Sequence, residues 1–76
     1  MKQHLRYRLR QRFNIKVSRT NAPKFINNLL SIQGFIEYDG TGHNENRKLY
    51  HITIAKINAV VVYDHLKNCP VTVWAI

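Results

Sequence analysis

The fold of this chain is decided by residues 21–36, which read NAPKFINNLLSIQGFI. Apolar side chains recur in this stretch at the three- and four-residue spacing of an amphipathic helix. They are Phe25, Ile26, Leu29, Leu30 and Ile32. Pro23 suits the first turn of a helix, where its missing N–H costs no hydrogen bond, and Gly34 suits the position just past the end, where φ is often positive. We therefore expect a helix over residues 21–33.

A β-hairpin is predicted directly after this helix. Residues 35–39, FIEYD, and residues 48–56, KLYHITIAK, have the alternation of half-buried strands, and the polar loop between them, GTGHNEN, is rich in turn-forming residues. A terminal strand is expected over residues 71–76, because Pro70 ends whatever element precedes it. Residues 57–68 stay open between a strand, which their run of valines favours, and a short helix.

The stretch before the helix has two competing periodicities. Residues 5–17 read LRYRLRQRFNIKV, with apolar side chains at every odd position except Gln11. This alternation is typical of a strand with one solvated face. The four-residue spacing of the leucines and Phe13 also allows a helix. We expect a strand over residues 13–17 and leave residues 4–12 open between the two structures.

Together these elements predict one small α+β domain spanning residues 1–76. Its core is a strand, a helix and a β-hairpin, with the helix packed on an antiparallel sheet. If residues 57–68 are helical, the order becomes the ferredoxin-like βαββαβ; if they are extended, the sheet gains strands. No apolar run approaches the roughly 20 residues of a membrane span, so we expect no membrane contact.

Positive charge is crowded into the first third of the chain. The sequence has 12 Lys and Arg against 4 Asp and Glu, a net charge of +8, and no acid precedes Glu37. Such crowding is self-repelling, which favours an anionic partner over a bare solvated face, and nucleic acid is the usual partner of a small basic domain. On a strand, alternate arginines lie about 6.5–7 Å apart, close to the spacing of successive phosphates. The residues expected to hold backbone phosphates are Arg6, Arg8, Arg10, Arg12, Lys16, Arg19 and Lys24.

Patterns for catalysis, metals or cofactors are weak. The single cysteine, Cys69, and the histidines after residue 40 do not have the spacing of metal ligands. Glu37 and Asp39 are explained by a solvated hairpin edge. We expect a binding protein without enzymatic activity, catalytic residues, metal or cofactor, located inside the cell in the cytoplasm or the mitochondrion.

A family resemblance lies in residues 15–36. The stretch has Ile15-Lys16-Val17, a helix containing Leu29-Leu30, and then Gly34-Phe35-Ile36. It resembles the RNA-binding amino-terminal half of the bacterial-type small-subunit ribosomal protein family number eight, as a truncated or organellar member. The resemblance implies a ribosomal component that binds structured RNA by its basic face, beside other ribosomal proteins.

Two weaker similarities suggest alternatives. The helix followed by residues 34–54 resembles the recognition helix and wing of winged helix-turn-helix proteins, which implies a phage or plasmid DNA regulator with Arg19, Asn21 and Lys24 in the major groove. The stretch IQGFIEYDG is similar to the LAGLIDADG motif of homing endonucleases, with Asp39 at the metal-binding position. A further class is a small inhibitor module that docks on an acidic protein.

Overall fold

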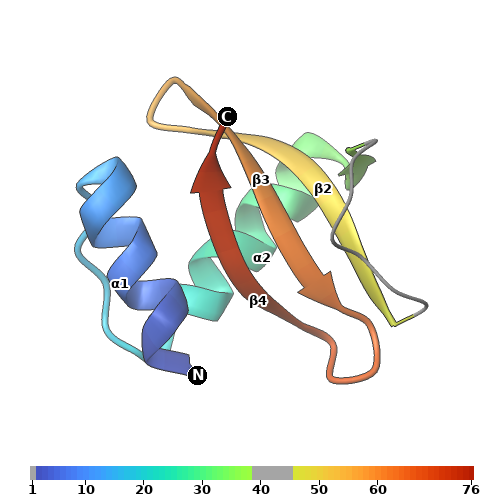
Figure 1. Ribbon diagram of the computed structural model, residues 1–76, viewed down its shortest axis with the longest axis horizontal. Coiled ribbons are helices and arrows are strands. Elements are labelled where there is room, and N and C mark those ends of the chain that lie inside the picture. The colour runs from blue at the N-terminus through green and yellow to red at the C-terminus, as the bar shows by residue number, and fades with distance from the viewer. Residues whose placement is uncertain (1, 39–45) are drawn as a thin grey trace.

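Two helices and a four-stranded antiparallel sheet form the protein in the computed structural model, which describes residues 2–38 and 46–76 (Figure 1). The elements are α1 (Lys2–Phe13), α2 (Asn21–Gln33), β1 (Ile36–Glu37), β2 (Arg47–Ile54), β3 (Ile57–Asp64) and β4 (Cys69–Ala75). The strands lie in the sheet in chain order, β1-β2-β3-β4. The α+β class is confirmed, and so is the packing of a helix on an antiparallel sheet.

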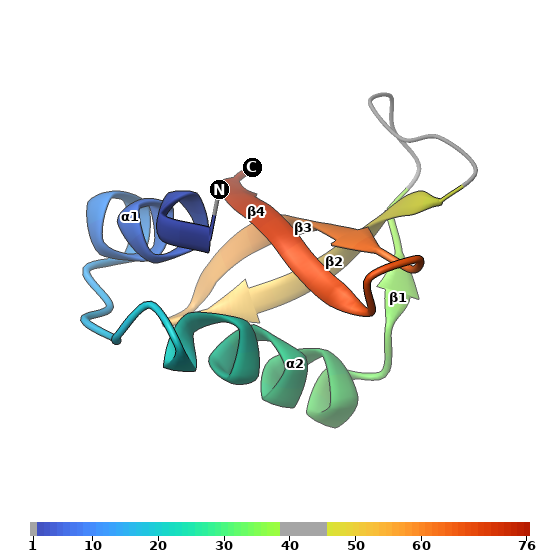
Figure 2. The same cartoon turned by 90° about the horizontal axis from the view of Figure 1, so that it is seen from below.

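The core lies between the helices and one face of the sheet. Helix α2 runs across that face, while α1 lies alongside β4 at one margin of the molecule (Figure 2). The buried side chains of this core are Leu5, Leu9, Phe13, Ala22, Ile26, Leu30, Tyr50, Ile52, Ile54, Ala59, Val61, Tyr63 and Val73, and Leu49, Val60 and Val62 form a second, smaller buried cluster. Neither helix in the described part of the chain is long and apolar enough to cross a membrane.

The first element is a helix, so the strand predicted over residues 13–17 is wrong. Leu5, Leu9 and Phe13, which we call the α1 stripe, are at most 4% exposed and meet on one side of the helix. A strand would also have turned Tyr7 toward the core, whereas this residue is 58% exposed. In a helix, residues four apart share one side, so the three residues of the α1 stripe are buried together while Tyr7 stays in solvent. This is the structure observed.

Helix α2 and its end agree with the prediction. Gly34 has φ of 92°, and the N–H groups of Gly34 and Phe35 both donate to the Leu30 carbonyl, at 2.8 and 3.0 Å. The side chain of Gln33 then bonds to the edge of β2. Its Nε2 donates to the Thr53 carbonyl at 2.9 Å, and its Oε1 accepts from the Thr53 N–H at 2.8 Å. This amide bridge replaces a strand neighbour and fixes the end of α2 on the sheet.

Residues 57–64 form a strand, so the ferredoxin-like order is not adopted. Strand β3 is central and pairs with both β2 and β4, which suits its β-branched residues. The final strand begins at Cys69, two residues earlier than predicted, and includes Pro70. Proline is tolerated there because β4 is an edge strand and its pairing with β3 shifts register beside Tyr63.

Candidate nucleic-acid interface

Helix α1 presents its arginines in two rows. Side chains four residues apart share a face of a helix, because it turns about 100° per residue. Arg6 and Arg10, the first row, lie on one flank of the α1 stripe, and Arg8 and Arg12, the second row, lie on the other. The rows are about 160° apart around the helix axis. The single row expected on a strand is therefore wrong.

The first row opens onto a hollow between α1 and the connector of residues 14–20. This hollow has a volume of about 320 Å³ and is lined by Arg6, Arg10, Ile15, Lys16, Val17 and Ser18. The three basic residues are exposed, while Ile15 and Val17 are half-buried. Its lining thus combines three basic residues and a serine with two aliphatic residues.

The connector is held at both ends, which places Lys16 beside the first row. The N–H of Ile15 donates to the Leu9 carbonyl at 3.1 Å, and the side chains of Ile15 and Val17 pack against the core. Lys16, between them, is left in solvent.

Ser18 closes the other end of the connector by capping α2. Its Oγ accepts from the Asn21 N–H at 3.1 Å, and its carbonyl accepts from the N–H groups of Asn21 and Ala22 at 3.1 and 2.9 Å. Thr20, at the position before the helix, makes no side-chain capping bond. Sequence reasoning about the basic face missed the hollow, because the hollow depends on α1 being helical.

The other predicted phosphate-binding residues lie outside the hollow. Arg12 and Arg19 are exposed on α1 and on the turn before α2, and Lys24 is exposed on the outer side of α2. Arg8 is half-buried and has an interaction of its own. The structure therefore joins Arg6, Arg10 and Lys16 into one site and spreads the remaining four around it.

The two described carboxylates belong to the sheet and are paired there. Glu37 lies 3.3 Å from Lys48 Nζ across the β1–β2 pair, and Asp64 Oδ2 lies 3.7 Å from Arg47 Nε. None of the residues that line the hollow is acidic. The positive potential of the hollow is thus not reduced by any carboxylate in its lining.

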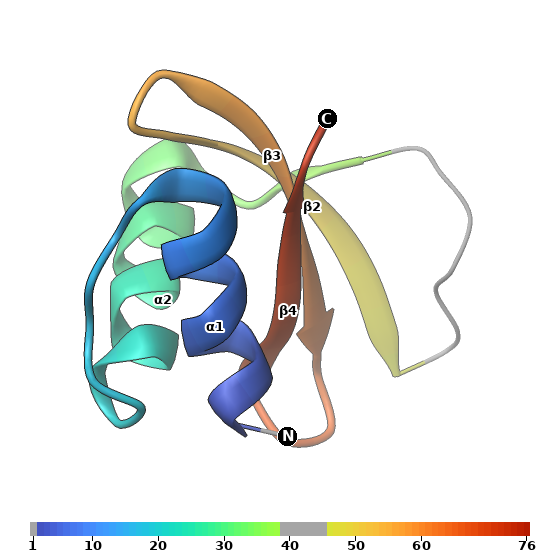
Figure 3. The same cartoon turned by 60° about the vertical axis from the view of Figure 1, so that its left-hand side comes forward.

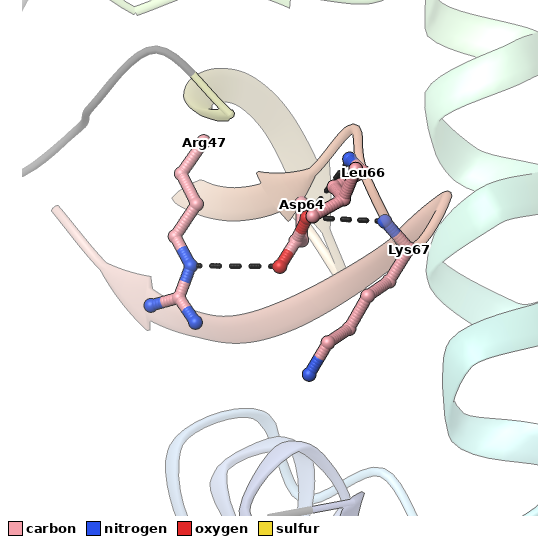
Figure 4. A network of polar contacts seen from close by, with 4 residues as sticks. All are labelled: Arg47, Asp64, Leu66 and Lys67. Carbon is pink, nitrogen blue, oxygen red and sulfur yellow. Dashed lines mark hydrogen bonds and ion pairs between the residues drawn. The ribbon is translucent and has the colours of Figure 1, made fainter.

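Asp64 organises the turn between β3 and β4 (Figure 4). Its Oδ1 accepts from the N–H groups of Lys67, at 3.1 Å, and Leu66, at 2.9 Å. The pKa of Asp64 lies below its usual value, chiefly because its carboxylate accepts the hydrogen bond from the Lys67 N–H. The hydrogen bond from Leu66 and the charges of Arg47 and Lys67 lower the pKa further, whereas burial opposes them. The role of this carboxylate is structural.

A cluster of aromatic side chains packs together at the sheet. The rings of Phe35, Tyr50 and Tyr63 meet edge to face at 5.3–6.1 Å, and Tyr50 Oη lies 2.7 Å from His65 Nε2. Burial raises the pKa of Tyr63. In the described part of the chain, no three His, Cys, Asp or Glu side chains gather where a metal ion could be held. Asp39, singled out by the homing-endonuclease similarity, lies outside the described residues.

Comparison with known proteins finds no match to a family model, to a curated protein or to a solved structure.

Proposed function

We propose that this protein binds structured RNA through α1 and the connector of residues 14–20, and that it acts by binding alone. The observation that carries the proposal is the convergence of Arg6, Arg10 and Lys16 on one hollow whose lining contains no carboxylate. A guanidinium group binds phosphate through two parallel hydrogen bonds, and an ammonium group adds a compact charge. A phosphate group in the hollow would relieve the mutual repulsion of the three cations.

A polyanion suits this surface better than a single small anion. Exposed Arg12, Arg19 and Lys24 extend the positive charge beyond the hollow, and the whole chain has a net charge of +8. A polymer that neutralises several of these charges releases condensed counterions at each contact, which adds to its affinity. The resemblance to the ribosomal family favours structured RNA, with other ribosomal proteins as neighbours, over other polyanions.

Duplex DNA is the second candidate, and one feature of α2 favours it. Asn21, Lys24, Asn28 and Ser31 are all exposed and follow the three- and four-residue spacing of one helix face. Asparagine and lysine side chains read base edges in a major groove. In that case, as in winged helix-turn-helix proteins, the face of α2 would bind a specific duplex sequence and α1 would support it.

The first test compares the Arg6→Gln/Arg10→Gln variant with the wild type in gel-shift titrations at two salt concentrations. We expect binding of structured RNA to weaken about ten-fold, and the slope of log K against log salt to fall by about 1.4–1.8, the share of two phosphate contacts. Thermal unfolding should be unchanged, because both side chains are exposed. The control is Lys48→Gln/Lys67→Gln, which removes the same charge from β2 and the β3–β4 turn and should leave the slope nearly unchanged.

Three results would contradict the proposal. In the first, the first-row variant and the control variant bind structured RNA equally well. In the second, the wild type prefers one duplex DNA sequence and loses that preference with Lys24→Gln, which favours the winged-helix alternative. In the third, the wild type forms a defined protein complex and has no salt-sensitive nucleic-acid binding, which favours the inhibitor module.

A further inference from the structure

The two arginine rows of α1 cannot serve one phosphate backbone. In a strand, Arg6, Arg8, Arg10 and Arg12 would share one face and follow a single backbone. In the helix, the rows lie on opposite flanks of the α1 stripe, about 160° apart. A single backbone passing one flank leaves the other flank about the width of a helix away.

From this geometry we infer that α1 lies in a groove between two phosphate backbones, so that the RNA target is double-stranded where α1 binds. The inference rests on the proposed function and adds to it the form of the target. The first row, with Lys16 and the hollow, would contact one backbone. The second row would contact the opposite backbone.

The side of α1 between the rows is suited to the floor of such a groove. Tyr7 and Gln11 lie on this outer side, opposite the α1 stripe; Tyr7 is 58% exposed, and Gln11 is exposed. A tyrosine ring stacks on an unpaired base, and a glutamine amide both donates and accepts hydrogen bonds at base edges. The sides of α1 that do not face the core thus carry side chains of the types that bind nucleic acid.

The position of α1 leaves this surface accessible. In Figures 1 and 2, α1 forms one margin of the molecule, and in Figure 3, where this side is turned forward, α1 lies in front of α2 with β4 beside it. The α1 stripe packs on the core, where α1 contacts β4 and α2, while Arg6, Tyr7, Arg10, Gln11 and Arg12 are exposed and Arg8 is half-buried.

The width of a helix restricts the kind of groove. An α-helix with its side chains is about 10–12 Å across, and a B-form major groove is about 12 Å wide. The deep groove of a regular A-form RNA helix is too narrow for side chains to enter. The RNA must therefore be opened by an internal loop or a bulge, which also supplies unpaired bases for Tyr7.

The test uses the full chain and three variants that each remove two charges. They are the first-row variant, the control variant and a second-row variant, Arg8→Gln/Arg12→Gln. The probes are an RNA hairpin with an internal loop in its stem, the same hairpin fully paired, a single-stranded RNA and a B-form DNA duplex. Binding is measured at two salt concentrations.

We expect the looped hairpin to be the tightest RNA ligand and both row variants to bind it about ten-fold more weakly than the control variant does. The first-row variant should lose more, because Lys16 and the hollow belong to that flank. The second-row variant should bind single-stranded RNA as the control variant does. Tyr7→Ala should weaken binding to the looped hairpin without changing the salt slope, since a lost stacking contact releases no counterions.

The inference and the proposed function fail differently. Equal binding of the looped hairpin by the second-row variant and the control variant would overturn the inference while the proposed function stands. A preference of the wild type for single-stranded RNA would do the same. Tighter binding to DNA than to every RNA, with both rows required, would support the groove and overturn RNA as the target. Absence of any salt-sensitive nucleic-acid binding would overturn both.

Discussion

The negative charge of the Asp64 carboxylate is stabilised by its neighbours in the fold. Its side chain is only 7% exposed, yet it has two backbone N–H donors and a nearby guanidinium. A carboxylate that accepts backbone N–H groups is stabilised in its charged form, so its pKa in the folded chain lies below the unfolded value. The acid therefore binds a proton less readily when the chain is folded, and the free energy of unfolding depends on pH.

The sign of this dependence gives a prediction. Asp64 stabilises the fold fully above its unfolded pKa of about 4, and this contribution is lost as the pH falls from there through the lower folded pKa. Asp64→Asn should be less stable than the wild type at neutral pH, and the difference should narrow as the pH falls. Urea unfolding over a pH series measures it. Glu37→Gln, at the exposed pair with Lys48, is the control and should change little. Parallel curves for Asp64→Asn and the wild type would disprove the role of the carboxylate.

Helix α2 is positioned by its last residue as well as by its apolar face. The apolar face, with Ala22, Ile26 and Leu30 fully buried, holds the helix on the sheet. That face permits small rotations and shifts along the axis, because apolar contact is not directional. The Gln33 amide bridge to Thr53 is directional, so it determines where α2 ends relative to β2.

Removing this bridge should loosen one edge of the sheet. Gln33→Ala leaves the Thr53 N–H and carbonyl without the amide, and we expect a loss of about 1 kcal/mol, since solvent can replace part of the two bonds. The Thr53 amide should exchange with deuterium faster than in the wild type. Ser31→Ala, an exposed change on the same helix, is the control. Unchanged exchange at Thr53 would show that the bridge does not contribute in solution.

The molecule separates its charges between its two layers. Described acids pair with bases on the sheet, at Glu37 with Lys48 and at Asp64 with Arg47, while the arginine rows stand on α1 at the margin. Such an asymmetric charge steers a polyanion toward one side of the protein. Docking of α1 on the core is what places that charge, so packing and the proposed binding surface depend on the same contact.

Leu9 therefore links stability with the proposed binding. It is fully buried in the middle of the α1 stripe, and Leu9→Ala should lower the free energy of unfolding by about 3 kcal/mol through lost burial and a cavity. Binding of structured RNA should weaken as α1 detaches, although no cationic side chain has been removed. Tyr7→Ala, on the exposed side of the same helix, should leave the stability nearly unchanged. Denaturant unfolding of both variants and gel shifts on Leu9→Ala check this, and wild-type stability of Leu9→Ala would contradict the observed packing.

Local chemistry in the sequence was enough to predict several features of this protein. Helix α2, the left-handed Gly34 and the presence of a strand on either side of the loop follow from periodicity and backbone preference, which act over a few residues. The bounds predicted for these strands were wrong, since Phe35, Ala55 and Lys56 have positive φ and lie outside the observed strands. The concentration of basic residues before Glu37 is a matter of composition alone. These properties need no knowledge of distant contacts.

Tertiary contacts decided the rest. The spacing of Leu5, Leu9 and Phe13 satisfies a strand and a helix equally, and only the packing of β4 and α2 around these three side chains selects the helix. That choice divides the arginines into two rows and creates the hollow with Lys16. The valines of residues 57–64 favour a strand but left a short helix open, and pairing with strands on both sides, a long-range condition, decided between them. The sequence alone thus determines the number and sign of the charges, whereas their arrangement in space depends on which residues the folded core buries.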